Sequence, residues 1–531
     1  MLFPAPSPPA TPPRVVITGA GIVTALGHGW KNNAEGFRAG RRAFRPVTLF
    51  DVSRQRARIA AEVTVPNTLP PTRLTQRQSA RLDRAGAMLL TASHEAWQQS
   101  GWEPSHHLPL VLGTTAGGMS LGEDYFHQAV RKPHHHRGQP TRAFQYQAQA
   151  HGRIVADALG FQGPITIISN ACASGSNAIG HAWELIRRGV AGRVLAGGYD
   201  ALSLMVFAGF DSLQALSTTT CRPFDARRDG LALGEGAATL ALESLDVARE
   251  RNAAILGEII GYGTTMDAHH LTQPHPQGDA ALAAMTLASE AASVAPPDID
   301  YVNAHGTGTP LNDSAEALAI NRWAGQHATT LPVSSTKAGI GHLLGGAGAV
   351  EAVACLMALR EQWLPPEITF ESPDPTCRFP IVDKPQDGRL RVVLSNSFGF
   401  GGVNATLFLR RWAGAEFLSV GWARFLRRAG RSPLWPRRWT RASRFPSSPC
   451  CGPAGKGHCA SGACRLRPRG LRSSPTRVCG DPAPSRTTRR PRLLKPRPGC
   501  VRARGSDAGW ASSSASSRAA CNTPCGSWRK P

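Results

Sequence analysis

The sequence lacks any apolar segment that approaches the roughly 18 residues a membrane-spanning helix needs. Its first 13 residues are rich in Pro and Ala, and no basic stretch with an apolar core follows, as a secretory signal would require. Cys221, Cys355 and Cys377 have neither disulfide-like nor metal-binding spacing. We therefore expect a flexible leader at 1–13, no membrane insertion, and a protein with reduced thiols in the cytoplasm.

Acidic residues are nearly missing from residues 413–531. This segment holds 25 of the 60 Lys and Arg residues but 3 of the 36 Asp and Glu residues, a net charge of +22, so the rest carries only +2 of the total +24. Eight of the 12 cysteines also lie there, without zinc-binding spacing. We expect a disordered basic tail at 412–531, with the composition of a frameshift or read-through product. Binding of nucleic acid or an anionic membrane by this tail stays an open alternative.

One cysteine stands at a strand-to-helix junction. The β-rich run Pro164-Ile-Thr-Ile-Ile-Ser-Asn leads to Ala171-Cys172-Ala173-Ser174-Gly175, and apolar residues at helical spacing predict a helix from Ser174 to Arg188. A helix N-terminus stabilises a thiolate, and its free N–H groups bind an oxyanion. Cys172 is therefore a candidate nucleophile, although a lone cysteine among small residues is also common as core filler.

Three later segments place polar residues at further strand-to-loop junctions. They are Tyr301-Val-Asn-Ala-His305-Gly-Thr-Gly-Thr-Pro310, Val333-Ser-Ser-Thr-Lys337-Ala-Gly-Ile-Gly-His342 before a predicted helix 342–360, and Ser395-Asn-Ser-Phe-Gly-Phe400-Gly-Gly-Val-Asn404. A Claisen condensation between two thioesters needs a nucleophile to hold an acyl group and N–H donors to stabilise an enolate. One Cys, two His and one Lys meet these needs.

Two other motifs favour structural interpretations. Gly19-Ala-Gly21 follows a predicted strand, but Thr24 takes the place of the third glycine of a dinucleotide-binding loop, so we expect a tight strand–loop junction. His134-His135-His136 lies between Pro, Gly and Arg with no carboxylate at useful spacing, so we expect a solvated loop and no metal site.

The four motifs, together with Arg14-Val-Val-Ile-Thr-Gly-Ala-Gly and Pro223-Phe-Asp-Ala-Arg-Arg-Asp-Gly, resemble the elongating β-ketoacyl-acyl carrier protein synthases of the thiolase superfamily, from about Arg14 to Arg411. The resemblance implies an α/β fold of two duplicated βαβαβαββ halves in a five-layer α-β-α-β-α sandwich. We expect the nucleophile half at 14–260 and the half with both histidines at 261–411. The loop Gly306-Thr-Gly-Thr-Pro310 resembles polyketide-type ketosynthases, so the acyl chain and the pathway stay open.

The resemblance also implies roles for individual residues. Cys172 would carry the acyl group, and His305 and His342 would stabilise the enolate after malonyl decarboxylation. The N–H groups of Cys172 and Phe400 would bind the tetrahedral oxyanion, with Phe400 as gatekeeper. Lys337 would be electrostatic, paired with Glu351 and with Asp313 or Glu316, although a solvated face is the alternative for Glu316. Substrate contacts would come from Thr307, Thr309, Phe398, Asp267 and His270.

Its implied substrates are malonyl and acyl thioesters on the phosphopantetheine arm of an acyl carrier protein, and the enzyme itself would bind no cofactor. We expect a homodimer and no specific binding of nucleic acid. An acidic carrier needs a basic surface, for which the candidates are Arg77, Arg81 and Arg84 on one predicted helix, with Arg131 and Lys132; solvated surface charge is the alternative. A non-catalytic chain-length-factor-like partner, or a nucleic-acid-binding protein built on the tail, are the competing functions.

Overall fold

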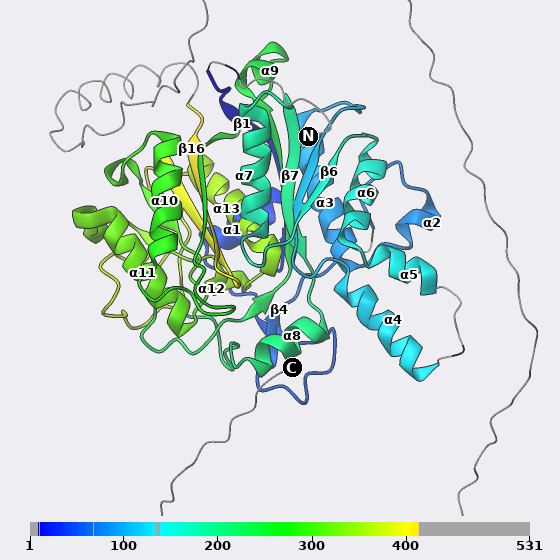
Figure 1. Ribbon diagram of the computed structural model, residues 1–531, viewed down its shortest axis with the longest axis horizontal. Helices are drawn as coiled ribbons and strands as arrows, with labels where there is room; N and C mark the ends of the chain where they lie inside the picture. Colours follow the sequence, from blue (N-terminus) through cyan, green and yellow to red (C-terminus); the bar gives the residue numbers. More distant parts are fainter. Residues whose placement is uncertain (1–8, 10, 67, 133, 135–138, 414–531) are drawn as a thin grey trace, which may run out of the picture. The chain divides into compact units, whose positions relative to one another are not determined.

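The computed structural model describes residues 9, 11–66, 68–132, 134 and 139–413 (Figure 1). Eleven strands form its main sheet. They are β1 (Val15–Thr24), β2 (Gly27–His28), β5 (Leu110–Gly113), β6 (Ile165–Ile168), β7 (Arg193–Asp200), β9 (Gly236–Ser244), β10 (Gly257–Met266), β11 (Tyr301–Asn303), β12 (Val333–Ser334), β15 (Val392–Gly399) and β16 (Val403–Arg411). Short strands pair outside it: β3 (Arg45–Pro46), β4 (Ile59–Ala61) and β8 (Leu233–Gly234) in one sheet, β13 (Trp363–Leu364) and β14 (Gln386–Asp387) in another.

The main sheet contains the same pattern twice. In the order β1-β9-β7-β5-β6 the first two pairings are antiparallel and the last two parallel, and β10-β16-β15-β11-β12 repeats this pattern with the same chain order. The repeats join where Val15–Ile17 of β1 pairs with 257–259 of β10. The repeat therefore confirms a duplicated fold. The expected division at residue 260 cuts β10, all of which belongs to the second repeat.

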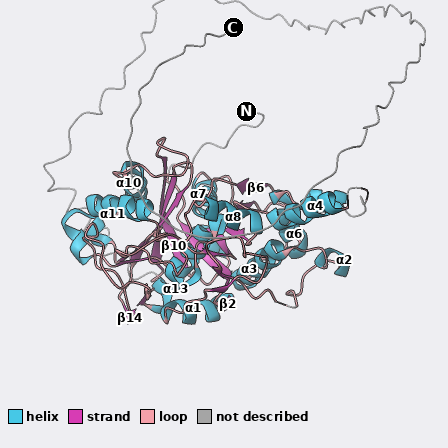
Figure 2. Cartoon of the chain, turned by 90° about the horizontal axis from the view of Figure 1, so that it is seen from below, coloured by secondary structure: helices cyan, strands magenta, loops and turns pink. Residues whose placement is uncertain are grey.

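Helices pack on both faces of each repeat (Figure 2). Outside the first repeat lie α3 (Arg84–Ser100) and α6 (Ala148–Leu159), and outside the second lie α10 (Asp279–Ala292) and α11 (Pro310–Ala324). Between the repeats lie α7 (Ser174–Arg187) and α13 (Ala347–Glu361), which contact each other and strands of both repeats. Thirteen of the fifteen α13 residues are buried, as a helix enclosed on all sides requires. These are the five expected layers.

The remaining helices are α1 (Gly29–Arg38), α2 (Gln76–Ser79), α4 (Met119–Arg131), α5 (Gln139–Gln145), α8 (Leu204–Ser212), α9 (Leu245–Glu250) and α12 (Lys337–Ile340). The helix expected from residue 342 begins only at Ala347, because Gly341, Leu344 and a short 3₁₀ turn at Leu344–Gly346 interrupt it. Gly19 and Gly21 lie inside β1, where a Cβ atom would meet the backbone oxygens of Ala96 and Ala92 on α3. They are helix-packing positions and form no nucleotide-binding loop.

The two ends of the folded part can be compared with the boundaries expected for the leader and the tail. Trp412, assigned above to the tail, packs against Val16, Leu245 and Ala248, and the Arg14 guanidinium lies 5.4 Å from its ring centre. The folded part thus extends one residue past the expected boundary, while the leader up to residue 8, His135, His136 and the tail from residue 414 lie outside the described residues. No helix in the described ranges is both long and apolar enough to cross a membrane.

Candidate active site

The turn between β6 and α7 holds Cys172 at the start of the central layer. Ala171 has a φ of 56°, a conformation rare for residues with a side chain. The Ser174 hydroxyl fixes the turn, since it accepts a hydrogen bond from the Asn170 N–H (2.9 Å) and donates one to the Ala171 carbonyl (2.6 Å). Cys172 in this turn is only 6% exposed.

The second repeat brings two histidines to this cysteine. His305 follows β11, and His342 follows α12. The Cys172 sulfur and one nitrogen of each ring all lie within 4.8 Å of one another, and the ring centres are 5.3 Å apart with the planes at 85°. Thiol and imidazole groups are also zinc donors, and this is the one such cluster among the described residues. The sequence analysis had assigned the same three residues to one site.

Hydrogen bonds fix which nitrogen of each histidine carries the proton. The Leu344 N–H donates to His342 Nδ1 (3.0 Å), and the Lys337 ammonium, which can only donate, lies 3.3 Å from His305 Nδ1. In both neutral rings the proton therefore sits on Nε2. Lys337 is itself buried and held by an ion pair with Glu351.

Burial sets the charge of the His305, His342 and Cys172 side chains. It lowers the pKa of His305 and His342 well below the ordinary value, and the nearby Lys337 charge lowers both further, so both rings are neutral. Burial raises the pKa of Cys172 to about 12, although the Lys337 charge and the N–H groups of Phe400 and Cys172 oppose this. Desolvation therefore outweighs the helix terminus, and Cys172 rests as a neutral thiol.

Two buried carboxylates on α11 hold the His305 loop. Glu316 accepts the N–H groups of His305 and Gly306, both at 2.8 Å, and Asp313 accepts those of Thr307 (3.0 Å) and Gly308 (3.1 Å). Neither forms an ion pair with Lys337 within the described residues, so of the three expected partners only Glu351 is correct. Glu316 is 1% exposed and is no solvated charge; burial raises its pKa to about 7.

The glycine hinge between β15 and β16 forms one wall of the site. Gly401 and Gly402 have φ values of 85° and 84°, a conformation that favours glycine, and the N–H of the preceding Phe400 hydrogen-bonds to the Cys172 sulfur. The Phe400 ring stacks on Phe210 of α8 with centres 5.6 Å apart. Phe398 is buried with its ring centre 5.7 Å from that of His305. Phe210 escaped the sequence analysis as a single residue, although its apolar segment 202–210 was the available signal.

These residues surround a cavity of about 280 Å³. Thr307 and Thr309 line it, with their hydroxyl oxygens 2.8 Å apart. Asp267 also lines it and accepts a hydrogen bond from the Asn404 amide (2.9 Å), which holds the hinge in place. His270 does not line the cavity: it is exposed, and its Nδ1 accepts the Thr272 N–H (3.1 Å).

Sequence reasoning missed one buried acid beside the site. Asp200, at the end of β7, accepts the N–H groups of Thr115 (2.9 Å), Ala116 (2.8 Å) and Gly345 (2.6 Å) and so ties the loops around Cys172 together. Its signal in the sequence was an acidic residue directly after a buried strand.

The expected basic docking helix is not one helix. Arg77 lies on α2, Arg81 lies in the following loop, and α3 begins at Arg84. Arg84 is also committed elsewhere, because its guanidinium contacts the Glu235 carboxylate and the Val63 carbonyl. Arg131 and Lys132 are exposed at the end of α4, as docking residues would have to be.

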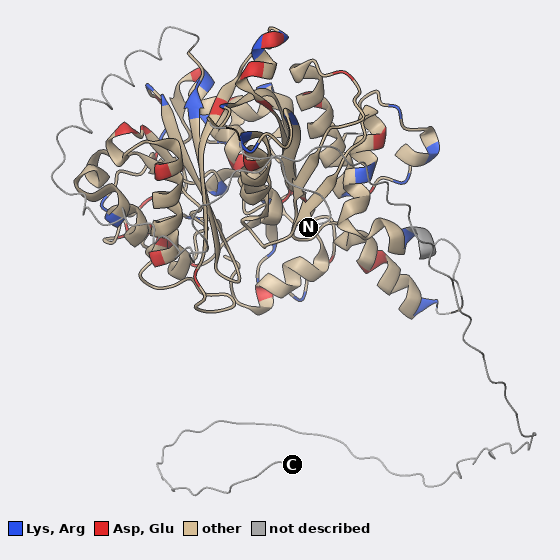
Figure 3. Ribbon diagram, turned by 45° about the horizontal axis from the view of Figure 1, so that its top comes forward, with Lys and Arg blue, Asp and Glu red and all other residues tan. Residues whose placement is uncertain are grey.

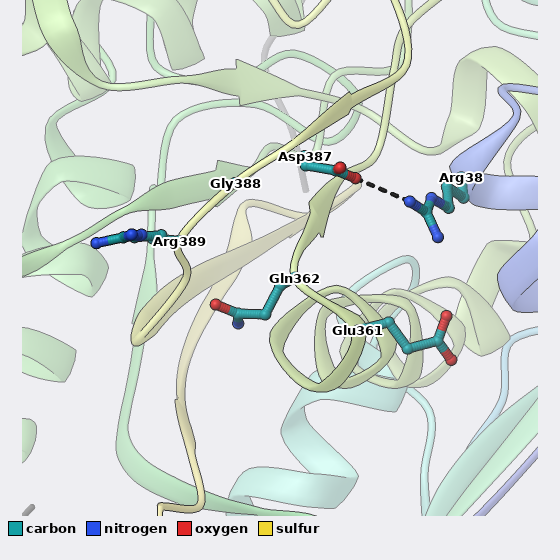
Figure 4. Close-up of a pocket in the computed structure, with 6 residues that line it drawn as sticks. All are labelled: Arg38, Glu361, Gln362, Asp387, Gly388 and Arg389. Carbon is teal, nitrogen blue, oxygen red and sulfur yellow. Dashed lines mark hydrogen bonds and ion pairs between the residues drawn. The ribbon is translucent and has the colours of Figure 1, made fainter.

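A second pocket, of about 420 Å³, lies apart from the cavity (Figure 4). The Arg38 guanidinium pairs with Asp387 at 2.9 Å on one side of it, and its other lining residues are Glu361, Gln362, Gly388 and Arg389. It is lined by no thiol, hydroxyl or imidazole group, whereas the cavity at Cys172 holds the thiol and both imidazoles.

Two known protein domains match most of the folded part of this chain. Residues 13–248 match the β-ketoacyl synthase N-terminal domain and residues 256–371 match the C-terminal domain. The chain is 39% identical to 3-oxoacyl-[acyl-carrier-protein] synthase 2 of Synechocystis sp. and 37% identical to that of Coxiella burnetii, each match covering 75% of this chain and 98% of the relative.

Solved structures give the same result. The ishigamide ketosynthase/chain length factor superposes with a TM-score of 0.70 at 32% identity, and a β-ketoacyl synthase from Burkholderia phymatum superposes with 0.68 at 34%; both matches cover 76% of this chain and all of the other. The chain belongs to the β-ketoacyl synthase family.

Proposed function

We propose that this protein condenses malonyl-acyl carrier protein with an enzyme-bound acyl thioester, with loss of CO₂, and so elongates a fatty-acid or polyketide chain by two carbons. The carrying observation is that Cys172 shares one cavity with two neutral histidines that both present Nε2–H. The relatives named above as 3-oxoacyl-[acyl-carrier-protein] synthases support the same reaction.

In the first half-reaction the Cys172 sulfur attacks the carbonyl of a carrier-borne acyl thioester. The thiol must lose its proton during this attack. Both imidazoles already hold a proton on Nε2 and accept a hydrogen bond at Nδ1, so the thiol proton passes to the departing carrier sulfur. The tetrahedral oxyanion lies at the N–H groups of Cys172 and Phe400. The acyl–sulfur bond to the carrier then breaks, the carrier thiol takes up the proton, and the acyl group remains on Cys172.

In the second half-reaction a malonyl thioester loses CO₂, and the electron pair of the broken bond forms an enolate. The Nε2–H groups of His305 and His342 donate to the enolate oxygen, a contribution of about 3 kcal/mol for each such donor. The enolate carbon attacks the acyl-Cys172 carbonyl, the carbon–sulfur bond breaks, and Cys172 is released and reprotonated. Thr307 and Thr309, which line the cavity, contact the phosphopantetheine arm in this proposal. The residues supply every step without a metal or nucleotide.

The two competing functions find less support. A chain-length-factor-like partner would not need a nucleophile with two oriented donors, which this chain retains. A nucleic-acid-binding role would depend on the tail, which lies outside the described residues.

We also propose a cytoplasmic homodimer. The strand β6 is an edge of the main sheet, and all four of its residues are only half-buried. Helix α4 exposes Tyr125, Phe126 and Val130, helix α5 exposes Phe144, and Tyr146 is exposed directly after α5. An exposed strand edge and an apolar surface are the features that an interface between two copies would cover. Light scattering on the purified protein should give twice the monomer mass, and a monomer would contradict the proposal.

Product analysis tests the condensing function directly. The protein should convert acyl-carrier and malonyl-carrier into β-ketoacyl-carrier, detected by mass spectrometry of the intact carrier protein. Cys172→Ser is the inactive control. Wild-type protein that acylates at Cys172 yet forms no β-ketoacyl product would contradict the proposal.

A further inference from the structure

The turn that follows His342 decides which nitrogen of its ring carries the proton. The Leu344 N–H donates to His342 Nδ1 (3.0 Å), which leaves the proton of the neutral ring on Nε2. The backbone of His342 is fixed beside β8, because its N–H donates to the Ala232 carbonyl (2.7 Å) and its carbonyl accepts the Gly234 N–H (3.0 Å). The proton position therefore depends on where the turn holds the Leu344 N–H.

Leu344 has a backbone conformation that needs support from its surroundings. Its φ is 51°, which is rare for a residue with a bulky side chain and persists only where neighbouring contacts hold it. The Leu344 side chain is buried, and the next N–H along the chain, that of Gly345, donates to the Asp200 carboxylate at 2.6 Å. A Cβ atom on Gly345 would lie 2.5 Å from the Thr115 nitrogen. The turn of the second repeat is thus held by residues of the first.

Asp200 is a buried acid that serves only hydrogen-bond donors. Acidic and basic residues are scattered over the described fold (Figure 3), whereas Asp200 is 0% exposed. Within the described ranges it has no ion pair, and five donors surround its two oxygens. They are the Thr114 hydroxyl (2.5 Å) and the N–H groups of Ala116 (2.8 Å) and Gly117 (3.1 Å) at Oδ1, and the N–H groups of Thr115 (2.9 Å) and Gly345 (2.6 Å) at Oδ2. Both oxygens must accept, so the arrangement fits the carboxylate form.

We propose that Asp200 is a positioning residue for the decarboxylation step. Its carboxylate holds the turn 343–346 so that the Leu344 N–H keeps the His342 proton on Nε2, the position that donates to the enolate oxygen. This inference rests on the proposed function and adds a residue of the first repeat to the enolate site of the second. Asp200 acts through His342, so its loss should affect the half-reaction that uses the His342 proton.

Asp200→Asn tests this role, because it keeps the side-chain shape but leaves one acceptor oxygen. The amide oxygen serves the side with three donors, and the NH₂ group then faces the Thr115 and Gly345 N–H groups, which lose their acceptor. We expect CO₂ release from malonyl-carrier to fall by about tenfold or more, and acylation of Cys172 by acyl-carrier to fall by less than about threefold.

Asp225→Asn is the matched control. Asp225 is also 0% exposed and accepts backbone N–H groups, those of Arg227 (2.8 Å), Glu371 (2.7 Å) and Ser372 (2.7 Å), but it does not bind the turn after His342. Its loss should lower the melting temperature without changing the ratio of decarboxylation to acylation.

The position of the His342 proton can be measured directly by ¹⁵N NMR on protein with ¹⁵N-labelled histidine, since protonated and bare ring nitrogens give distinct signals. Absence of the signal in His342→Ala assigns it. The wild type should show the proton on Nε2 alone, and Asp200→Asn should show both tautomers. A purely structural role of Asp200 would lower the melting temperature and leave the tautomer unchanged.

Three results would overturn the proposal. The first is a proton on His342 Nδ1 in the wild type, a measurement that needs no variant. The second is CO₂ release by folded Asp200→Asn within about twofold of the wild type. The third is an equal loss of both half-reactions with an unchanged His342 tautomer. Failure of the proposed function looks different: the wild type would then neither become acylated nor release CO₂.

Discussion

At Cys172 a helix N-terminus and a buried cavity act on the same sulfur atom in opposite directions. Burial dominates and raises the pKa to about 12, so the thiol keeps its proton until it attacks the thioester. Cys172→Ser should abolish transfer of the acyl group to the enzyme, because a hydroxyl is a far weaker nucleophile. Mass spectrometry of the intact protein after incubation with acyl-carrier measures this. Acylation of the variant at another residue would remove Cys172 from its assigned role.

His305 and His342 act later than Cys172 in the proposed mechanism. Replacing either by Ala should slow malonyl decarboxylation by about 10²-fold, because one N–H donor to the enolate is lost. Acylation of Cys172 should fall much less, because neither imidazole takes up the thiol proton in that step. Release of CO₂ and acylation, measured separately, distinguish the two effects. Equal losses together with a lower melting temperature would mean that the histidines are structural.

Glu316 predicts a pH-dependent stability. Burial raises its pKa from the ordinary value of 4.5 to about 7, so the folded state holds a proton that the unfolded state releases between these pH values. As pH rises from 4.5 to 7, the free energy of unfolding therefore falls by up to about 3 kcal/mol through this one group. In Glu316→Gln this loss is absent, so the variant should gain stability relative to the wild type between pH 5 and pH 8.

Urea denaturation at the two pH values measures this difference. A variant whose stability relative to the wild type is the same at both pH values would contradict the raised pKa of Glu316.

At the scale of elements, the close packing of α7 on α13 explains the glycine behind the nucleophile. A Cβ atom on Gly175 would lie 2.7 Å from the Ala349 nitrogen and 2.9 Å from the Gly345 oxygen, which are backbone atoms that cannot move separately. Gly175→Ala should therefore destabilise the protein by about 1–3 kcal/mol. Gly209→Ala on α8 is the matched control, because no atom lies within 4 Å of its Cβ and Ala favours helix. Thermal melting of both variants decides the point; equal melting temperatures would contradict it.

At the scale of the whole molecule, every predicted catalytic residue and the closing strand β16 precede Ala413. A chain that ends after Ala413 should keep its melting temperature and turnover. Ending it after Arg411 removes Trp412 from its contacts with Val16 and Arg14 and should lower stability by about 1 kcal/mol. Side-by-side purification of the full chain and both shortened forms tests this. An unfolded or inactive form ending at Ala413 would make residues 414–531 part of the enzyme.

The sequence by itself determined the chemistry of this protein. Cys172, His305, Lys337 and His342 could be found from sequence because each stands at a junction marked by glycines and small residues, where local pattern and backbone geometry agree. The family resemblance of its motifs also implied the duplicated fold, and α7 ends within one residue of its expected end.

Only the tertiary structure decided the burial and the charge partners of those residues. The Cys172 pKa depends on burial by segments far away in sequence, and the Lys337 partner depends on which carboxylate the fold brings near: Glu351, with Glu316 and Asp313 turned to loop N–H groups instead. The Phe210–Phe400 stack likewise joins residues from different segments, and the fold puts Arg77 and Arg84 on different helices. A local sequence pattern cannot predict such contacts, because desolvation and charge pairing depend on neighbours in three dimensions.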